Sequence, residues 1–408
     1  MDTFVARQPI FDGRESVYGY ELLFRSGLEN AFTHADPDQA SAKVISDTLL
    51  LLGVDAAAGG KKAFVNVTRD VLLGEIISML PREAVVVEVL ETVAPDAEVI
   101  AACRKLKRAG YALALDDFRD PDRNHPLLDL ADIVKVDFLA TGEGERAALA
   151  RRLVPRGIQC LAEKVETREV FREAQALGYR SFQGYFFSRP VVMARRDVPG
   201  FKLNYLQILG EIHRTELDFR QMEKIIGRDT SLSYKLLRYL NSAFFGLRGP
   251  VGSIQHALLM LGEREVKKWV TLVALAGMAM DKPEELLIQA LIRAKFCESL
   301  ALRVRLADRA GELFLVGMFS LIDAMLDRPL PEILDGIPIA GDVKAALLQQ
   351  EGPLCGPYDC ALAYARGDWA RLGEIAARLG IPEAETPPLY MDAVRWCREG
   401  FAPGLLRA

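Results

Sequence analysis

The stretch Ala112-Leu113-Ala114-Leu115-Asp116-Asp117-Phe118 is a short apolar run followed by two adjacent carboxylates. Seven further runs that are short and largely apolar occur before residue 190. They span Phe4–Ile10, Val17–Arg25, Lys62–Val67, Val85–Glu91, Ile133–Phe138, Gln159–Val165 and Ser181–Ser188. Runs that are apolar throughout indicate strands buried on both faces, as in a parallel sheet whose strands are joined by helices.

The number of these runs favours one α/β architecture over another. Eight strands joined by helices predict a closed, TIM-like (β/α)8 barrel, although such barrels usually need about 250 residues. The alternative, an open doubly wound sheet, requires a glycine-rich phosphate-binding turn after the first strand. The corresponding turn, Phe11-Asp12-Gly13-Arg14, contains a single glycine. We therefore predict a barrel.

The apolar periodicity becomes helical after Arg189-Pro190. The segment Val191–Lys202, which contains a basic pair, is the candidate linker. Apolar residues then recur at helical spacing, for example over Leu287–Leu302 and Leu313–Leu326, and a helix that begins at Ser253 is expected to end at Gly262. The sequence predicts a barrel domain over residues 1–198 and an all-α domain over residues 199–408.

Composition describes a globular protein. Of the 408 residues, 50% are hydrophobic and 26% are charged, which excludes intrinsic disorder. The formal net charge is −5, so we expect no direct nucleic-acid binding. The longest strongly apolar stretch, Trp269–Met280, is shorter than the roughly 18 residues of a membrane span. Without a secretion signal or paired cysteine motifs, we expect a cytoplasmic protein with reduced cysteines.

Polar side chains interrupt or close the predicted strands, where burial is unfavourable unless a partner is present. In chain order these residues are Glu21, Asn66, Glu88, Asp116, Asp117, Lys135, Glu163 and Gln183. The carboxyl ends of barrel strands carry function, and ligands with oxygen donors alone suit Mg²⁺ or Mn²⁺ rather than zinc. Asp116 and Asp117 could bridge two ions, an arrangement that hydrolyses phosphodiesters, and Lys135 could orient the water. Alternatively, some of these residues cap strands or form ion pairs.

The same segments resemble the successive motifs of EAL domains. The matching segments are Gln8–Ile10, Tyr20–Arg25, Val65–Thr68, Glu88–Glu91, Leu115–Phe118, Val134–Asp137, Ala162–Glu166 and Gln183–Pro190. They cover nearly all of the first half in the order that the family has. The resemblance implies a (β/α)8 barrel that hydrolyses cyclic di-GMP to linear pGpG with two Mg²⁺ or Mn²⁺ ions. It also implies a homodimer, because EAL barrels commonly pair through a helix near the loop after Asp117.

The resemblance also implies a role for each site residue. The metal ligands would be Glu21, Asn66, Glu88, Asp116, Asp117 and Glu163. Lys135 and Gln183 would position the attacking water, and together with Glu21 and Glu163 they form the expected catalytic set. The nucleotide groove would be lined by Gln8, Arg25, Arg189 and Pro190.

The sequence departs from the EAL pattern around these residues. The signature Glu-Ala-Leu is here Glu21-Leu22-Leu23, which keeps the ligand. Active members continue after the paired aspartates with a glycine-rich turn, whereas this chain has Arg119–Asn124, without glycine. Lys164 replaces the usual glycine beside Glu163, and Leu90 replaces a threonine. Three functions therefore stay open: a phosphodiesterase, a receptor that binds cyclic di-GMP without cleaving it, and a protein–protein scaffold.

In the helical half, Asp229–Gly246 resembles the core signature of HDOD domains, with support from Ser253–Ala257 and Leu261-Gly262. The resemblance implies a helical relative of the HD metal phosphohydrolases that lacks the metal ligands and contacts a signalling protein partner. The histidines of the chain agree with this, because none precedes an aspartate; they are His34, His125, His213 and His256. We expect His213 and His256 to be packing or surface residues.

Overall fold

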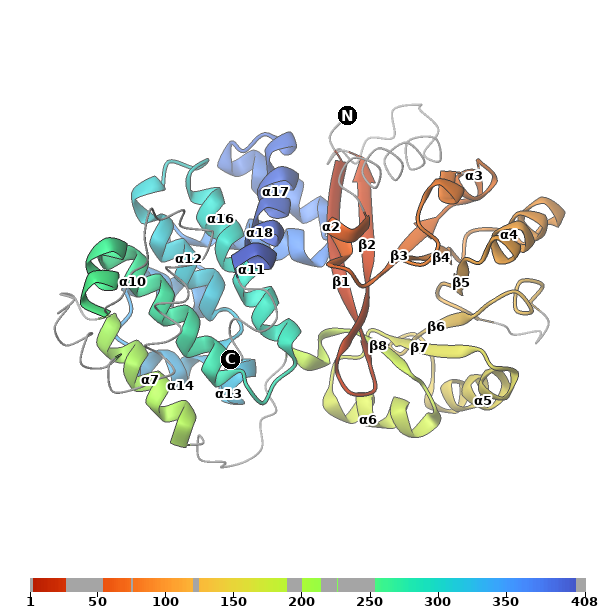
Figure 1. Cartoon of the computed structure of the whole chain (residues 1–408), viewed down its shortest axis with the longest axis horizontal. Helices are drawn as coiled ribbons and strands as arrows, with labels where there is room; N and C mark the ends of the chain where they lie inside the picture. Colours follow the sequence, from red (N-terminus) through yellow and green to blue (C-terminus); the bar gives the residue numbers. More distant parts are fainter. Residues whose placement is uncertain are drawn as a thin grey trace. The chain divides into compact units, whose positions relative to one another are not determined.

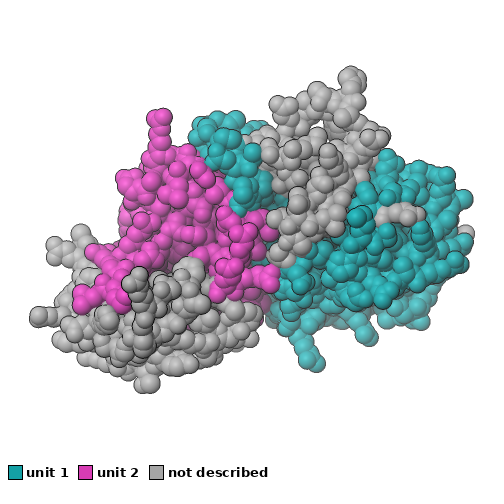
Figure 2. All heavy atoms as spheres, turned by 45° about the horizontal axis from the view of Figure 1, so that its top comes forward, with its two compact units in different colours: residues 1–189, 362–388 teal, residues 190–361, 389–408 magenta. Residues whose placement is uncertain are grey.

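The computed structural model describes residues 3–26, 54–74, 76–119, 125–188, 200–213, 226 and 254–400. The chain divides into two compact units, which Figure 2 distinguishes by colour. One unit contains residues 1–189 and 362–388, and the other contains residues 190–361 and 389–408. The predicted boundary at residue 198 and most of the predicted linker fall outside the described residues.

Eight strands close into a barrel in sequence order, which confirms the predicted fold (Figure 1). They are β1 (Thr3–Asp12), β2 (Val17–Ser26), β3 (Lys62–Val67), β4 (Val85–Val89), β5 (Ala112–Leu115), β6 (Ile133–Asp137), β7 (Gln159–Glu163) and β8 (Ser181–Gln183). Several strands end earlier than their apolar runs. For example, β5 stops at Leu115, so that Asp116 and Asp117 follow the strand directly.

The first strand corrects the expectation of a parallel sheet. β1 is antiparallel to both β2 and β8, whereas the other neighbouring strands are parallel. Only the short turn Gly13–Ser16 joins β1 to β2, and strands joined in this way must be antiparallel. Within the turn, Asp12 Oδ1 accepts hydrogen bonds from the backbone N–H groups of Arg14 and Ser16, at 2.8 and 2.9 Å.

Short helices and 3-10 turns connect the strands of the barrel. The helices are α2 (Val54–Ala58), α3 (Arg69–Leu73), α4 (Ala97–Ala109), α5 (Glu143–Leu153) and α6 (Arg168–Leu177). α4 shows how the sequence sets their ends. Asp96 caps its first turn by accepting a hydrogen bond from the backbone N–H of Val99, and Gly110 ends it with a φ of 93°.

The chain from residue 200 onward is helical throughout its described part, as predicted. The helices are α7 (Gly200–Ile212), α10 (Ile254–Met278), α11 (Glu284–Ala301), α12 (Ala310–Phe319), α13 (Ile322–Leu326), α14 (Leu330–Asp335), α15 (Gly341–Leu348), α16 (Cys355–Arg366), α17 (Trp369–Leu379) and α18 (Thr386–Gly400). Gly262 has a φ of 71° within α10, where two helical segments meet. The HDOD-like signature Asp229–Gly246 lies outside the described residues. Among the described helices, none has both the length and the apolarity to cross a membrane.

A segment late in the sequence, Leu362–Pro388, belongs to the same compact unit as the barrel. Its residues contact the β1–β2 hairpin. The hydroxyl of Tyr364 donates a hydrogen bond to the carbonyl of Val5, at 3.3 Å. Gly367 has a φ of 68°, and a Cβ atom there would lie 2.8 Å from Leu23 Cδ1, so this close approach requires glycine. The sequence does not predict this association.

Candidate functional site

Most of the predicted site residues whose side chains the structure places lie in one layer inside the barrel, next to a layer of buried apolar residues. The apolar layer consists of Ile10, Phe64, Val86, Ala114, Ile133 and Leu161. Side chains two positions apart in a strand point to the same side. The residues two positions further along the parallel strands are Asn66, Glu88, Asp116, Lys135 and Glu163. In the antiparallel strand β1 the corresponding residue, Gln8, instead precedes Ile10, and it pairs in register with Glu21.

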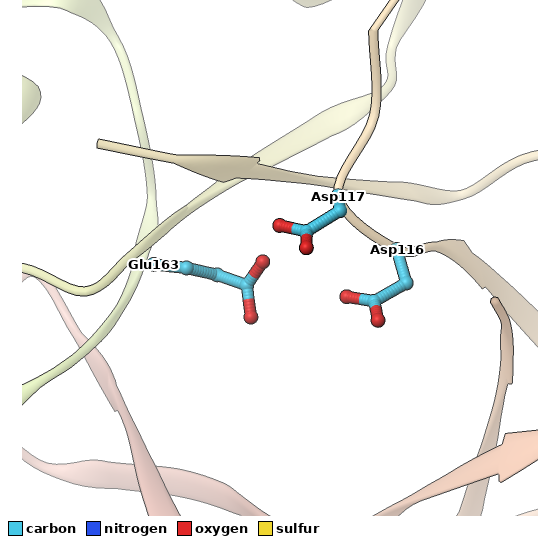
Figure 3. A group of neighbouring side chains, drawn as sticks. All are labelled: Asp116, Asp117 and Glu163. Carbon is cyan, nitrogen blue, oxygen red and sulfur yellow. The ribbon is translucent and has the colours of Figure 1, made fainter. Parts of the chain in front are cut away.

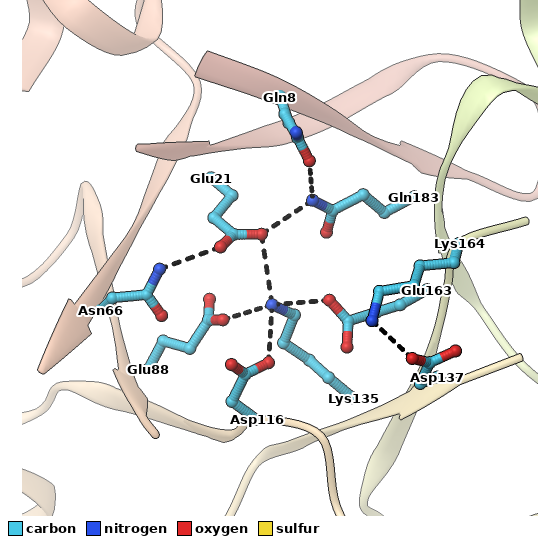
Figure 4. A network of polar contacts seen from close by, with 10 residues as sticks. All are labelled: Gln8, Glu21, Asn66, Glu88, Asp116, Lys135, Asp137, Glu163, Lys164 and Gln183. Carbon is cyan, nitrogen blue, oxygen red and sulfur yellow. Dashed lines mark hydrogen bonds and ion pairs between the residues drawn. The ribbon is translucent and has the colours of Figure 1, made fainter. Parts of the chain in front are cut away.

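Lys135 lies at the centre of this layer, with a side chain that is only 1% exposed (Figure 4). Its Nζ atom is 3.2 Å from Glu21, 3.0 Å from Asp116 and 2.8 Å from Glu163, and it also pairs with Glu88. Burial alone would lower the pKa of Lys135, but the four carboxylates raise that pKa well above its ordinary value. The lysine is therefore a buried cation that draws together carboxylates from separate strands.

Two amides orient Glu21. Its Oε1 atom accepts a hydrogen bond from Asn66 Nδ2 at 2.9 Å, and its Oε2 atom accepts one from Gln183 Nε2 at 2.7 Å. Gln183 Nε2 also donates to Gln8 Oε1 at 3.0 Å. Burial would raise the pKa of Glu21, but the charge of Lys135 and these hydrogen bonds together lower it below its usual value. Glu21 is thus held as a carboxylate in a fixed orientation.

The backbone behind Gln183 is constrained by a glycine. Gly184 has a φ of 148°, and a Cβ atom there would lie 2.1 Å from the carbonyl oxygen of Val165. The Val165 N–H donates to the Gln183 carbonyl at 2.9 Å, and the Phe186 N–H donates to the Val165 carbonyl at 3.1 Å. This close backbone contact fixes the position from which the Gln183 amide reaches the site.

The remaining carboxylates exceed what one ammonium group can neutralise. Burial, followed by the charge of Glu21, raises the pKa of Glu88 well above its usual value. Burial raises the pKa of Glu163 to about 7 although Lys135 opposes the shift. Burial and the charge of Asp116 also raise the pKa of Asp117. Additional positive charge in the site would favour the ionised forms of these carboxyl groups.

Asp116, Asp117 and Glu163, here called the acidic triad, each offer a carboxylate oxygen within 4.8 Å of the others (Figure 3). Within the described part of the chain, several buried oxygens of the site lack a hydrogen-bond partner. They are Asn66 Oδ1, Glu88 Oε2, Asp117 Oδ1, Glu163 Oε2 and Gln183 Oε1. Buried acceptors without donors are unfavourable, and a set of oxygen donors of this kind fits a hard divalent cation.

Two site residues were not assigned from the sequence. Asp137 follows Lys135 by two positions in β6 and so points to the same side, and it pairs in register with Glu163. Lys164 Nζ lies 2.5 Å from Asp137 Oδ2 (Figure 4). The two-residue period of the strand could have revealed Asp137, whereas its contact with Lys164 depends on the pairing of β6 with β7.

The structure does not describe the side chains of three residues expected in the nucleotide groove. Arg25 lies in β2 and pairs in register with Phe4, but its side chain is outside the described portion of the structure. Arg189 and Pro190 also lie outside the described residues. Gln8 is the member of this group whose side chain the structure places, next to Gln183.

Comparisons with known proteins identify the family. A family model of the EAL domain matches residues 67–190, and one of the HDOD domain matches residues 198–326. The uncharacterized protein YuxH of Bacillus subtilis is 35% identical over 97% of this chain and 98% of its own length. This chain belongs to the EAL–HDOD family. A second relative of this EAL–HDOD chain is the cyclic di-GMP phosphodiesterase CdgJ of Vibrio cholerae, with 34% identity. The match covers 97% of this chain and 93% of CdgJ.

Solved structures are similar to parts of the EAL–HDOD chain. BlrP1 of Klebsiella pneumoniae, in a complex with calcium and cyclic di-GMP, is 25% identical over 47% of this chain, with a TM-score of 0.39. The match covers 56% of the BlrP1 chain. YkuI of Bacillus subtilis, in complex with cyclic di-GMP and calcium, is 17% identical over 56% of this chain and 72% of its own, with a TM-score of 0.39.

Proposed function

We propose that the barrel of this EAL–HDOD protein hydrolyses cyclic di-GMP to linear pGpG with two Mg²⁺ or Mn²⁺ ions. One observation carries the proposal: buried carboxylates from separate strands converge on one layer, where several of their oxygens lack partners. Such a donor set suits a pair of hard cations, and paired ions stabilise an in-line displacement at phosphorus. The name of the relative CdgJ, a cyclic di-GMP phosphodiesterase, supports the choice of substrate.

Each residue has a proposed role. The metal ligands are Glu21, Asn66, Glu88, Asp116, Asp117 and Glu163. Lys135 and Gln183 position the attacking water. Gln8, Arg25, Arg189 and Pro190 line the groove for the nucleotide.

In the proposed reaction, the oxygen of a water molecule bonds to phosphorus and the water loses a proton, while one phosphodiester P–O bond breaks. The leaving oxygen takes up a proton, so that the proton lost by the water is balanced. The bound ions would lower the pKa of that water and stabilise the charge that develops on the phosphoryl oxygens. Lys135 contributes a fixed positive charge, and the Gln183 amide contributes a hydrogen-bond donor from a rigid backbone. A layer of buried apolar residues lies beneath the site and closes that side of it.

A second candidate function, binding without hydrolysis, is favoured by the backbone beside the acidic triad. Both Asp117 and Lys164 have positive φ values, of 39° and 53°, which residues with side chains adopt at an energetic cost. A triad with strained backbone at Asp117, and with Lys164 where the EAL pattern has glycine, could bind the nucleotide yet position the second ion poorly. Changes in groups that support metal ligands typically reduce activity or affinity by about 10- to 100-fold.

One assay separates these functions. Purified full-length protein is incubated with cyclic di-GMP and MgCl₂ or MnCl₂, and linear pGpG is followed by chromatography. We expect turnover that Glu21→Ala abolishes and that Glu83→Ala, a change of an exposed carboxylate before β4, leaves intact. Tight binding of cyclic di-GMP in calorimetry, without product, would support a receptor that does not cleave the nucleotide. Absence of cyclic di-GMP binding would support a protein–protein scaffold.

We further propose that the helical half contacts a signalling protein partner, that the protein acts in the cytoplasm and that it forms a homodimer. The match of residues 198–326 to the HDOD model supports the assignment of this half as an interaction domain. His213 packs edge-on against Phe319 and hydrogen-bonds Thr271 at 3.1 Å, which fits the packing role that the sequence predicts for it. Light scattering would test the dimer, and crosslinking in cells would test the partner.

A further inference from the structure

Lys164 occupies an unusual backbone position beside the acidic triad. It follows Glu163 directly and has a φ of 53°, in the left-handed region that disfavours lysine. Its side chain is half exposed, and Nζ lies 2.5 Å from Asp137 Oδ2. A residue with a side chain persists in such a conformation only when the surrounding structure fixes it.

Asp137 is the fixed partner in this ion pair. Its other oxygen, Oδ1, accepts hydrogen bonds from the backbone N–H groups of Leu139 and Ala140, at 2.7 and 2.9 Å. Burial would raise the pKa of Asp137, but the bonds from Lys164 and these N–H groups together lower it. The bond to Asp137 in turn raises the pKa of Lys164. Both groups are therefore charged near neutral pH.

The pair lies next to the triad because Asp137 and Glu163 are register partners in β6 and β7. The charges of Asp117 and Glu163 act on Lys164, and the charge of Lys164 acts on Asp117. Lys164 therefore interacts electrostatically with members of the triad.

We infer that Lys164 weakens the binding of a divalent ion at the acidic triad by neutralising Asp137 and by placing a positive charge beside Asp117. This inference rests on the proposed metal-dependent function and identifies a residue that regulates it. Without Lys164, Asp137 would add an uncompensated negative charge next to Glu163. Charges at this range are coupled strongly where water is partly excluded, so we expect the ion at the triad to bind about tenfold more tightly.

Mn²⁺ binding to the nucleotide-free, full-length protein tests the inference. Titration followed by electron paramagnetic resonance and calorimetry should give two ions of different affinity. In Lys164→Met the weaker ion should bind about tenfold more tightly. Lys164→Gly should behave in the same way, because it lacks the charge but suits the positive φ, whereas Lys164→Arg should keep the wild-type affinity. Lys61→Met, which removes an exposed charge before β3, is the matched control and should bind as wild type does.

A double variant separates charge from packing. Lys164→Met combined with Asp137→Asn removes both charges of the pair, and it should return the weaker ion to near wild-type affinity. Wild-type affinity in Lys164→Met, or unchanged tight binding in the double variant, would overturn the inference while leaving the metal-dependent function intact. A wild-type protein that binds no Mn²⁺ would overturn both.

Discussion

The hydroxyl of Tyr364 donates a hydrogen bond to the backbone carbonyl of Val5, and this bond joins the end of α16 to the first strand of the barrel. Tyr364 is fully buried, and its ring packs edge-on against Trp369 at 5.4 Å between centroids. The first half of the sequence forms the barrel, and the segment Leu362–Pro388 near the end of the chain belongs to the same compact unit.

Removing this hydroxyl should destabilise the barrel. Tyr364→Phe keeps the ring but leaves the Val5 carbonyl without this donor, which typically costs about 1 kcal/mol for a buried hydrogen bond. Urea unfolding followed by circular dichroism measures the loss. A variant with the wild-type unfolding midpoint would show that the contact does not stabilise the fold.

Gly184→Ala should disturb the site through the backbone. The added Cβ would meet the Val165 carbonyl at 2.1 Å, so the chain after Gln183 must move. We expect a loss of about 2 kcal/mol or more in stability, in the range of changes at strained backbone positions, together with weaker Mn²⁺ binding. Gly144→Ala, in the first turn of α5 with no atom near its Cβ, is the control and should be neutral or slightly stabilising. Equal behaviour of the two variants would contradict this account.

Lys135→Met should lower the free energy of unfolding, because the carboxylates around this lysine would then repel one another. The variant leaves Glu21, Glu88, Asp116 and Glu163 without their shared ammonium group. Breaking a buried ion pair by removing one partner costs about 3–5 kcal/mol. We expect a loss of this size in EDTA, measured by urea unfolding, and a partial recovery on addition of MnCl₂, because an ion bound only by the folded protein stabilises it. A loss that Mn²⁺ does not reduce would count against an ion in this layer.

His213 should make the helical unit sensitive to mild acid. Burial, with the charge of Lys267, lowers the pKa of His213 from 6.5 to about 4. Between these two values the unfolded chain binds a proton that the folded chain does not, so stability is present at neutral pH and falls as the pH drops from 6.5 towards 4. At pH 5 the loss attributable to this residue is about 2 kcal/mol.

Comparing the wild type with His213→Gln at two pH values isolates this effect. The change in unfolding free energy between pH 7 and pH 5 should be smaller in the variant by about 2 kcal/mol. Other titrating groups act equally in both proteins and cancel in the difference. The same pH dependence in both proteins would show that folding does not lower the pKa of His213.

Much of the barrel could be predicted from the sequence because its strands are buried on both faces. Val85–Val89 is an apolar run with one polar residue, Glu88, and Ile133–Asp137 is an apolar run with two, Lys135 and Asp137. Both the strands and their functional side chains are therefore recognisable in the sequence. The direction of β1 was predicted incorrectly. Composition does not encode strand direction, although the short turn Gly13–Ser16 limits it to antiparallel pairing.

Other features depend on contacts that local sequence does not specify. Lys164 meets Asp137 only because β6 and β7 pair in one register. Tyr364 and Gly367 lie among helical residues, and nothing in their spacing shows that they pack on β1 and β2 rather than within the helical unit. Long-range packing of this kind is decided by the shapes of surfaces that exist only after folding.

The association of Leu362–Pro388 with the barrel has a consequence for the order of assembly during protein synthesis. The ribosome delivers β1 and β2 first and Tyr364 close to the end, so the hairpin must wait for the helical half to emerge before its packing is finished. A hybrid gene that joins this EAL half to the HDOD half of a relative would therefore also exchange part of the barrel's own scaffold.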